Sequence, residues 1–334
     1  MLSMKKLARA VAVLLATTGM AVLAACSGGG SSAQSSGAEG YTLRIGTTST
    51  TGTPAGNIGW GDKKGILKSD LAAAGVTNIK YSYFQSGADI VSALLAGAVD
   101  VAAVGDTPGL SSKGNGGDVT LLSLDSYNED MWLVGAKGGP TTIQGLAGKS
   151  VAAATGTQRD RSIRQLLDLA GLTTRVTVSN LGTPQALAAL KSGKIAGTVL
   201  GGADAYTLTQ QGYPVLDRLS KHKGLGGVGT DVALKSFVSK HPGFEKAWQN
   251  AIVSINRDIL GHFDDYLTWV SQLDGISVAL ERKGTDRKTF NTEPYPAAGI
   301  AELQTSLDFL EKQGDIKKPY KVADWVAESS GDQS

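Results

Sequence analysis

The chain has 334 residues, enough for two domains or one divided domain. Hydrophobic residues make up 41% and charged residues 19%, which excludes a disordered acidic chain or a collagen-like fibre. The formal net charge is +2, but Lys5, Lys6 and Arg9 lie in the first 25 residues. The rest of the chain has 29 basic and 30 acidic residues, so its charges nearly balance. This balance argues against nucleic-acid binding through global positive charge.

Cysteine and histidine are scarce. Cys26 is the only cysteine, which excludes an intrachain disulfide, a CxxC redox pair and a cysteine-ligated zinc site. None of His222, His241 and His262 lies four residues from another, the spacing that places two metal ligands on one helical face. We therefore predict neither a metal site nor a cofactor.

The N-terminal segment is typical of a secretory signal over residues 1–25. A basic start is followed by an apolar run of about 14 residues, whereas a membrane-spanning helix needs roughly 20. The sequence Leu23-Ala-Ala-Cys26 resembles the lipobox of bacterial lipoproteins, which implies that Cys26 carries lipid, palmitate included. The alternative is an ordinary signal peptide with a stray cysteine. Residues 26–40, rich in Gly and Ser, are expected to form a flexible tether.

The next segments alternate between strand and helix patterns, from Tyr41 to Val104. Leu43 and Ile45 alternate with polar residues as in a strand, and a helix is expected to run toward Leu71. A second strand covers 79–83, a helix covers 90–95, and Gly97 is placed to end it in the left-handed conformation. A buried strand follows over 99–104. This order predicts an α/β fold with largely parallel sheet.

A second segment repeats this plan about 96 residues later. The pattern Ala93-Leu-x-x-Gly97-x-Val99 returns as Ala189-Leu-x-x-Gly193-x-Ile195. We therefore predict two similar lobes, with strands at 151–154 and 176–178 and a helix from Ile163 in the second. The last third reads as helices, and we assign Trp248 to packing on one of their core faces.

Familiar enzyme motifs are incomplete, but several turns are suited to a ligand. No serine has the glycines of GxSxG, and the P-loop-like run ending at Ser150 lacks its first glycine. Strands run into helices at Gly105-Asp-Thr-Pro108, Thr155-Gly-Thr-Gln158 and Thr183-Pro184. These turns are either simple helix caps or, through their free N–H groups, anion sites at the carboxyl ends of strands.

The segment from Phe84 to Pro108 (FQSGADIVSALLAGAVDVAAVGDTP), with 146–157 and Gly201–Tyr206, resembles the aliphatic-sulfonate, taurine and nitrate binding proteins of bacterial ABC importers. The resemblance covers Tyr41 to about Leu234. It implies a two-lobed periplasmic-binding-protein fold of type II, with two segments crossing between the lobes near Met131 to Ala136 and Gly226 to Leu234. Lobe 1 would be 41–130 with 229–334, and lobe 2 would be 131–228.

The resemblance also implies ligand-binding residues. Thr107, Thr157 and Gln158 would donate to an anionic head group. Asp204 would either receive a ligand ammonium or cap a turn, and Arg159 would either pair with an anion or lie on the surface. The full set of expected positions is Thr50, Gly87, Asp106, Thr107, Thr157, Gln158 and Asp204, with Asp106 more suited to capping than to contact.

The function implied is an extracytoplasmic receptor, anchored to the membrane through Cys26 at the cell surface or in the periplasm. It would capture a small organic anion, deliver it to an ABC permease, act as a monomer and catalyse no reaction. One alternative is an enzyme on the same fold, such as chorismate dehydratase, although the cysteine-rich segment of related pyrimidine synthases is absent. Another is a ligand-sensing lipoprotein.

Overall fold

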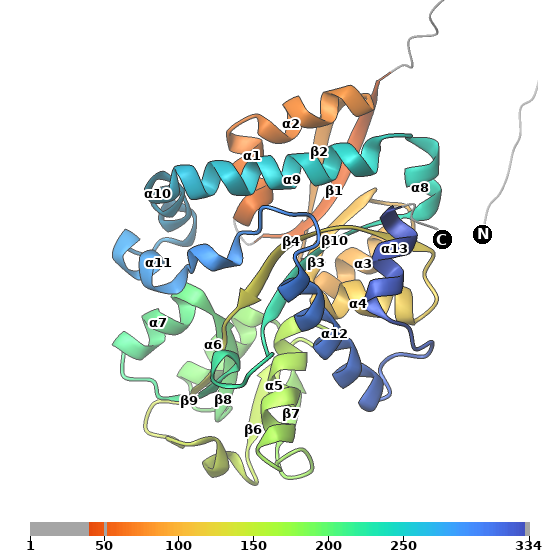
Figure 1. The fold of residues 1–334 in the computed structure, drawn as a ribbon. Helices are drawn as coiled ribbons and strands as arrows, with labels where there is room; N and C mark the ends of the chain where they lie inside the picture. The colour runs from red at the N-terminus through yellow and green to blue at the C-terminus, as the bar shows by residue number, and fades with distance from the viewer. Residues whose placement is uncertain (1–39, 50–51, 331–334) are drawn as a thin grey trace, which may run out of the picture. The chain divides into compact units, whose positions relative to one another are not determined.

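The computed structural model describes residues 40–49 and 52–330 (Figure 1). Cys26 and Thr50, together with the predicted signal and all but the last residue of the predicted tether, lie outside the described residues. Within the described part, no helix combines the length and the apolar character that crossing a membrane requires.

Two five-stranded sheets form the centres of two lobes. The first sheet has the order β2 (Val76–Phe84), β1 (Tyr41–Thr48), β3 (Val101–Gly105), β10 (Gly227–Leu234) and β4 (Val119–Glu129). The second has the order β7 (Thr177–Asn180), β6 (Ser150–Ala153), β8 (Gly197–Gly201), β5 (Met131–Gly135) and β9 (Val215–Arg218). The α/β class and the two lobes predicted from the sequence are confirmed.

Each sheet is mixed, whereas the sequence predicted largely parallel sheets. Strands β1, β2 and β3 are parallel, as are β6, β7 and β8, but β10 and β5 run antiparallel to their neighbours. Parallel strands need a crossover connection, usually a helix. The chain enters both β5 and β10 from a strand of the other lobe without a crossover α-helix, and both strands pair in the opposite direction.

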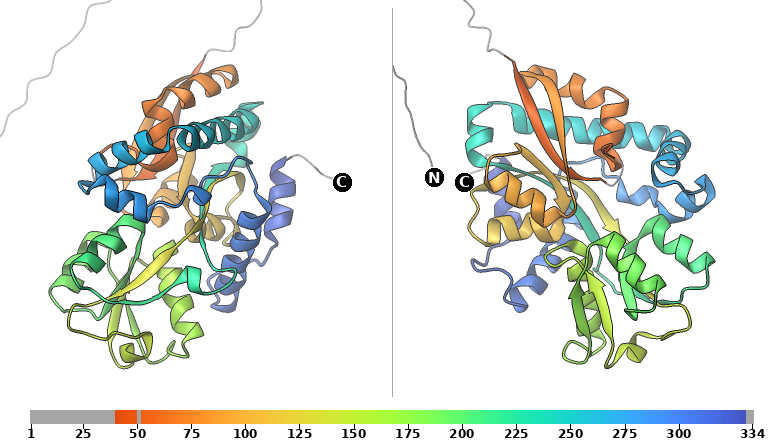
Figure 2. Two further views of the ribbon diagram at one scale, coloured as in Figure 1. Left: turned by 60° about the vertical axis from the view of Figure 1, so that its left-hand side comes forward. Right: turned by 180° about the vertical axis from the view of Figure 1, so that it is seen from behind.

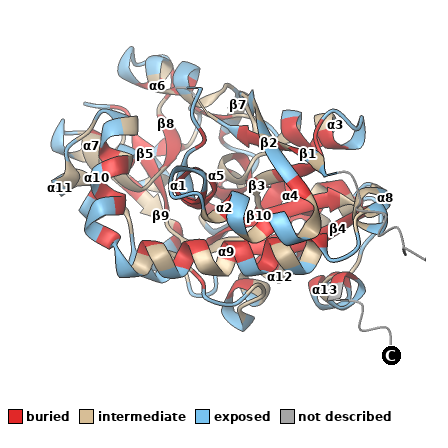
Figure 3. Ribbon diagram, turned by 90° about the horizontal axis from the view of Figure 1, so that it is seen from above, coloured by how far each residue is buried: buried red, intermediate tan, exposed pale blue. Residues whose placement is uncertain are grey.

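Helices cover both faces of the first sheet (Figures 1 and 3). Leu43 and Ile45 point to one face, whereas Gly46 points to the other, where an added Cβ would lie 2.7 Å from Ile90. The first face packs against α1 (Gly56–Lys63), α2 (Ile66–Leu71), α9 (Phe244–Gly261) and α10 (Phe263–Asp274). The second face packs against α3 (Gly87–Leu95), α4 (Asp106–Gly114), α12 (Ala297–Lys312) and α13 (Val322–Ser330).

Several local expectations are met and one is corrected. Gly97 and Gly193 follow α3 and α6 (Thr183–Lys191), both with φ of 71°, so the two lobes end matching helices in the same way. Trp248 is fully buried in the core. The single helix expected before Leu71 is instead two helices, α1 and α2. Gly65, with φ of 71°, separates them because a left-handed residue cannot continue an α-helix.

The second lobe is a smaller sandwich. Helix α5 (Gln158–Leu169) covers one face of its sheet, and α6 with α7 (Gly202–Gln210) covers the other. Among the described residues, short 3₁₀ helices lie at Ile143–Leu146 and Leu219–Lys221 in or next to this lobe, and at Ala72–Ala74 and Arg287–Thr289 in the first lobe.

The chain crosses between the lobes at two places (Figure 2). It passes from β4 to β5 at Asp130 and from β9 to β10 through residues 219–226. The crossing expected at Met131 to Ala136 therefore occurs just before that segment, which belongs to the second sheet. After α8 (Lys235–Lys240), α9 and α10, helix α11 (Val278–Gly284) reaches back and packs against α7 of the second lobe.

Candidate ligand-binding site

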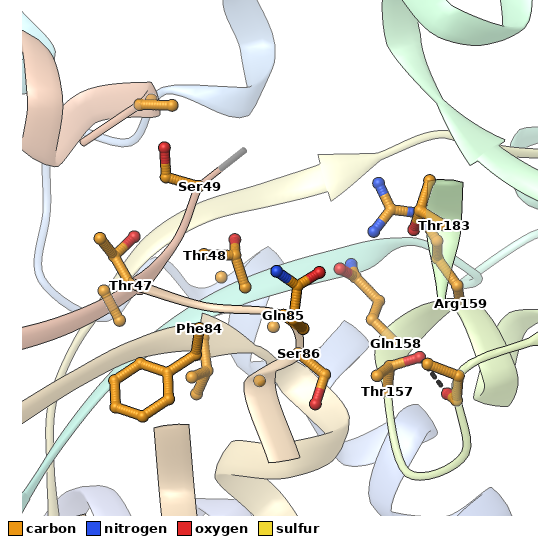
Figure 4. Close-up of a pocket in the computed structure, with 18 of the residues that line it drawn as sticks. Thr47, Thr48, Ser49, Phe84, Gln85, Ser86, Thr157, Gln158, Arg159 and Thr183 are labelled. Carbon is orange, nitrogen blue, oxygen red and sulfur yellow. Dashed lines mark hydrogen bonds between the residues drawn. The ribbon is translucent and has the colours of Figure 1, made fainter. Parts of the chain in front are cut away.

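A cavity of about 510 Å³ lies between the two lobes (Figure 4). Its walls come from the carboxyl ends of parallel strands in both sheets and from the helices that follow them. The first lobe contributes Thr47, Thr48, Ser49, Gln85, Ser86, Gly87, Asp125, Ser126 and Glu129, and the second contributes Thr157, Gln158, Arg159, Thr183 and Asp204. This is the edge of a parallel α/β sheet at which ligands usually bind.

Turn chemistry positions these walls. Ser86 caps α3, where its side chain accepts a hydrogen bond from the Asp89 N–H. Thr157 caps α5 in the same way through the Asp160 N–H. At Gly87, a Cβ would lie 2.8 Å from Pro108 Cγ, and the absence of a side chain therefore allows α3 to start close to α4. Helices α3 and α5 consequently begin at the cavity with their N-termini toward it.

Four predicted site residues line the cavity: Gly87, Thr157, Gln158 and Asp204. The side chains of two of them have partners inside the protein. The Thr157 hydroxyl donates to the Ala154 carbonyl at 2.6 Å, and Gln158 Nε2 donates to Glu129 Oε2 at 3.0 Å. The Thr157 contribution to a ligand is therefore restricted to its backbone N–H, and Gln158 links the two walls.

The expected roles of Asp106 and Thr107 are corrected by their burial. Asp106 is 0% exposed and Thr107 1% exposed, and neither lines the cavity. Thr107 Oγ1 donates to Asp106 Oδ1 at 2.8 Å. Asp106 in turn accepts hydrogen bonds from Arg161 and from the Val228 N–H, so its carboxyl group neither caps α4 nor lines the cavity. Thr50 cannot be placed because it lies outside the described residues.

The polar groups that are available to a ligand are ones that the sequence did not single out or left undecided. Arg159 lines the cavity, and its Nε is buried without a hydrogen-bond partner among the described residues. The side chains of Thr48, Gln85 and Thr183 also line it, and none forms a hydrogen bond to another residue that the structure describes. Figure 4 shows Arg159 and Thr183 on one wall and Gln85 and Thr48 on the opposite wall.

Acidic residues occupy other parts of the same cavity: Asp125, Glu129, Asp204 and Asp274. Asp274, at the end of α10, faces Glu281 of α11 and Asp204 of α7. Burial, followed by the charge of Asp274, raises the pKa of Glu281 to about 7. The cavity therefore combines one arginine with several carboxyl groups. Nowhere in the described part do three His, Asp or Glu side chains gather in a way that would hold a metal ion.

Sequence comparison and structure comparison differ in what they detect. No protein-family model matches the chain, and no curated protein is similar to it in sequence. Among solved structures, the alkanesulfonate-binding protein SsuA from Xanthomonas axonopodis pv. citri, bound to MOPS, is similar with a TM-score of 0.70 and 19% identity, over 86% of this chain and 98% of that one. A Candida albicans gene product described as having the generic periplasmic binding protein fold is similar with a TM-score of 0.67 and 13% identity, over 87% and 95%.

The chain has the periplasmic binding protein fold. The expected resemblance to sulfonate-binding proteins is thereby confirmed at the level of fold, since these identities are too low to carry a ligand over. The desulfurization enzyme DSZB has the same fold, with a TM-score of 0.61 and 15% identity, over 88% of this chain and 99% of that one. The periplasmic binding protein fold thus includes both receptors and an enzyme.

Proposed function

We propose that this periplasmic-binding-type protein is the extracytoplasmic receptor of an ABC importer. It captures a small organic anion between its lobes and delivers it to the permease. The proposal depends on one observation above all: the cation of Arg159 lines the cavity between the lobes, and its buried Nε has no hydrogen-bond partner among the residues that the structure describes. The fold, shared with an alkanesulfonate-binding protein, supports it.

The magnitude of this contact is sufficient to matter. A hydrogen bond to a charged group contributes about 1.5–3 kcal/mol, and 1.4 kcal/mol corresponds to tenfold in affinity. The Arg159 contact should therefore account for roughly 10- to 100-fold in affinity for an anion. The hydroxyls of Thr48 and Thr183, the Gln85 amide and the helix N-termini would provide the other donors.

The carboxyl groups favour a particular kind of anion. Asp204 and Asp274 line the same cavity as Arg159 and would repel a ligand that is only negative. A ligand that carries an ammonium group as well as a sulfonate satisfies both ends. Within the predicted ligands, a taurine-like aminosulfonate therefore suits the cavity better than a plain alkanesulfonate or nitrate.

Isothermal titration with three probes tests this function: 2-aminoethanesulfonate, ethanesulfonate and nitrate. We expect the aminosulfonate to bind most tightly, Arg159→Gln to weaken its binding at least about tenfold, and Asp204→Asn to remove the preference for the amine. Arg175→Gln, at an exposed position outside the cavity, is the matched control and should bind like the wild type. Unchanged affinity in Arg159→Gln, or the absence of binding by all three probes, contradicts the proposal.

The cellular setting is part of the same proposal. Residues 1–25 would be the signal peptide, Cys26 would carry the lipid, and 26–40 would connect the anchor to a monomeric receptor. Lobe 1 would consist of 41–130 with 229–334 and lobe 2 of 131–228. These bounds are supported by the two sheets, whose strands fall on either side of Asp130 and of the connection before β10.

An enzyme is the second candidate, because DSZB has this fold. A related solved structure of a cysteine-to-serine mutant of DSZB holds biphenyl-2-sulfinic acid. Here the single cysteine of the sequence is Cys26, outside the described residues, and the cavity of the described part contains none. We therefore propose binding without bond chemistry. Sulfite release from a bound sulfinate or sulfonate would contradict this.

A ligand-sensing role would use the same cleft. Loss of ligand uptake when the gene is deleted would favour transport over sensing.

A further inference from the structure

One serine hydroxyl lies between two carboxyl groups at the cavity wall. Ser126 Oγ is 2.9 Å from Asp125 Oδ1 and 2.7 Å from Glu129 Oε1, both normal hydrogen-bond distances. A hydroxyl has one proton to donate, whereas two ionised carboxylates can only accept. Both contacts are therefore satisfied together only when one of the carboxyl groups is itself protonated and donates to Ser126.

Asp125 is the carboxyl that suits the proton. Its side chain lies over Gly229, where a Cβ would be 1.7 Å from Oδ1. Burial, followed by the charges of Asp231 and Glu129, raises the pKa of Asp125 well above its usual range. Tyr266 of α10 is near enough for the charge of Asp125 to contribute, after burial and the charges of Glu281 and Asp274, to raising the pKa of the Tyr266 phenol.

The other elements packed around Asp125 provide no charge that would ionise it. Asn57 of α1 and Asn256 of α9 donate their amides, each at 3.1 Å, to the Asp125 backbone carbonyl and not to its carboxyl group. Within the described residues, no lysine, arginine or histidine forms an ion pair with Asp125. A neutral acid at this position is consistent with all of these neighbours.

Glu129 is an acceptor of two hydrogen bonds from side chains. It accepts hydrogen bonds from Ser126 Oγ and, at 3.0 Å, from Gln158 Nε2. Gln158 is the first residue of α5, so this second bond crosses from the first lobe to the second. Glu302 of α12 is the other carboxyl group near Glu129, and Glu302 accepts a hydrogen bond from the Asn128 N–H.

We propose that Asp125 is a positioning residue of the cleft: as a neutral acid it donates its proton to Ser126, Ser126 donates to Glu129, and Glu129 holds Gln158 of the second lobe. This inference rests on the proposed binding function. When Asp125 ionises, Ser126 faces two carboxylates and can donate to only one of them. Glu129 then loses the contact that fixes the orientation of its carboxylate toward Gln158 whenever Ser126 donates to Asp125. Ligand capture should therefore weaken as the pH rises.

The first test measures the affinity for 2-aminoethanesulfonate between about pH 5 and about pH 8. For the wild type we expect a fall of about tenfold or more as the pH rises. Asp125→Asn retains a donor without a titrating proton and should bind tightly at every pH. Ser126→Ala should bind weakly at every pH, and Asp118→Asn, at an exposed carboxyl with a side chain 78% exposed, should follow the wild type.

A second readout needs no ligand. The side-chain amide resonances of Gln158 in NMR spectra should shift with pH in the wild type and stay constant in folded Asp125→Asn and Ser126→Ala. Constant resonances in the wild type, or a wild-type pH profile in Asp125→Asn, overturn the inference. If the resonances behave as expected while no probe binds at any pH, the proposed function fails and the proton assignment stands.

Discussion

Arg159 and Arg161 lie two residues apart in the first turn of α5, but their side chains have different surroundings. Arg159 lines the cavity, whereas Arg161 is 1% exposed and forms an ion pair with Asp106, which is 0% exposed, over 2.8 Å. Arg161 Nε also donates to Asp106 Oδ1, and Nη2 donates to the Gly226 carbonyl. Successive residues of a helix point about 100° apart, so residues two apart face different sides. The buried pair therefore joins α5 of the second lobe to α4 of the first.

Removal of one member of this pair should be costly. Arg161→Met leaves the Asp106 carboxylate buried without its partner, and we expect the free energy of unfolding to fall by about 3–5 kcal/mol. Lys312→Met is the matched control, because Lys312 also joins the lobes, through Asp168, but with a side chain 62% exposed. It should cost less than about 1 kcal/mol. Urea unfolding measures both, and equal losses would contradict this account of Arg161.

At the scale of elements, α7 and α11 meet backbone to backbone. A Cβ on Gly284 would lie 2.2 Å from the Ala203 nitrogen, and a Cβ on Gly202 would lie 2.8 Å from the Gly284 carbonyl oxygen. Helix α11 follows the helices of the first lobe, whereas α7 belongs to the second. Glycine at both positions therefore allows the two lobes to approach closely at this edge of the cleft.

Gly284→Ala should force α7 and α11 apart. Overpacking of this kind costs about 1–3 kcal/mol of unfolding free energy. Gly261→Ala, at the end of α9, is the control, because an added Cβ meets nothing within 4 Å there. Alanine is also the better helix former, so this control should be neutral or stabilising by up to about 1 kcal/mol. Thermal unfolding of both variants checks the prediction, which fails if Gly284→Ala melts at the wild-type temperature.

At the scale of the whole molecule, two crossings and a bridge of helices join the lobes. The crossings are at Asp130 and over residues 219–226, and the lobes also meet through α5 with α4 and through α7 with α11. A ligand that contacts both walls of the cavity would add further contacts between the lobes and stabilise this arrangement of them. In the proposed function, the lipid on Cys26 would keep the receptor near its permease.

Lipidation is tested on the full chain expressed in a bacterium that processes lipoproteins. We expect labelled palmitate to be incorporated into the wild type and the wild type to remain in the membrane fraction. Cys26→Ala should incorporate none, because the chain contains no other cysteine. Ser27→Ala should be labelled like the wild type. Equal labelling of Cys26→Ala would refute the anchor.

The sequence by itself determined the local elements and their order, except that the one helix expected before Leu71 is two, α1 and α2. Alternating Leu43 and Ile45, the stripe of α9 and the glycines at 97 and 193 depend on neighbouring residues, and each produced the predicted strand, helix or helix end. The repeated plan likewise predicted two lobes. Such features follow from backbone geometry and hydrophobic periodicity, which are read over a few residues.

Only the tertiary structure decided which polar side chains are available to a ligand. Asp106 and Thr107 have the composition of a binding turn, but both are buried. Asp106 forms an ion pair with Arg161, which is 55 residues away in the sequence, and Thr107 donates a hydrogen bond to Asp106. The sequence left open whether Arg159 pairs with an anion or lies on the surface, and the structure shows that it lines the cavity opposite Gln85. The antiparallel strands β5 and β10 also depend on where the chain crosses between lobes. Each of these outcomes depends on partners from distant parts of the chain, and spacing along the sequence does not specify them.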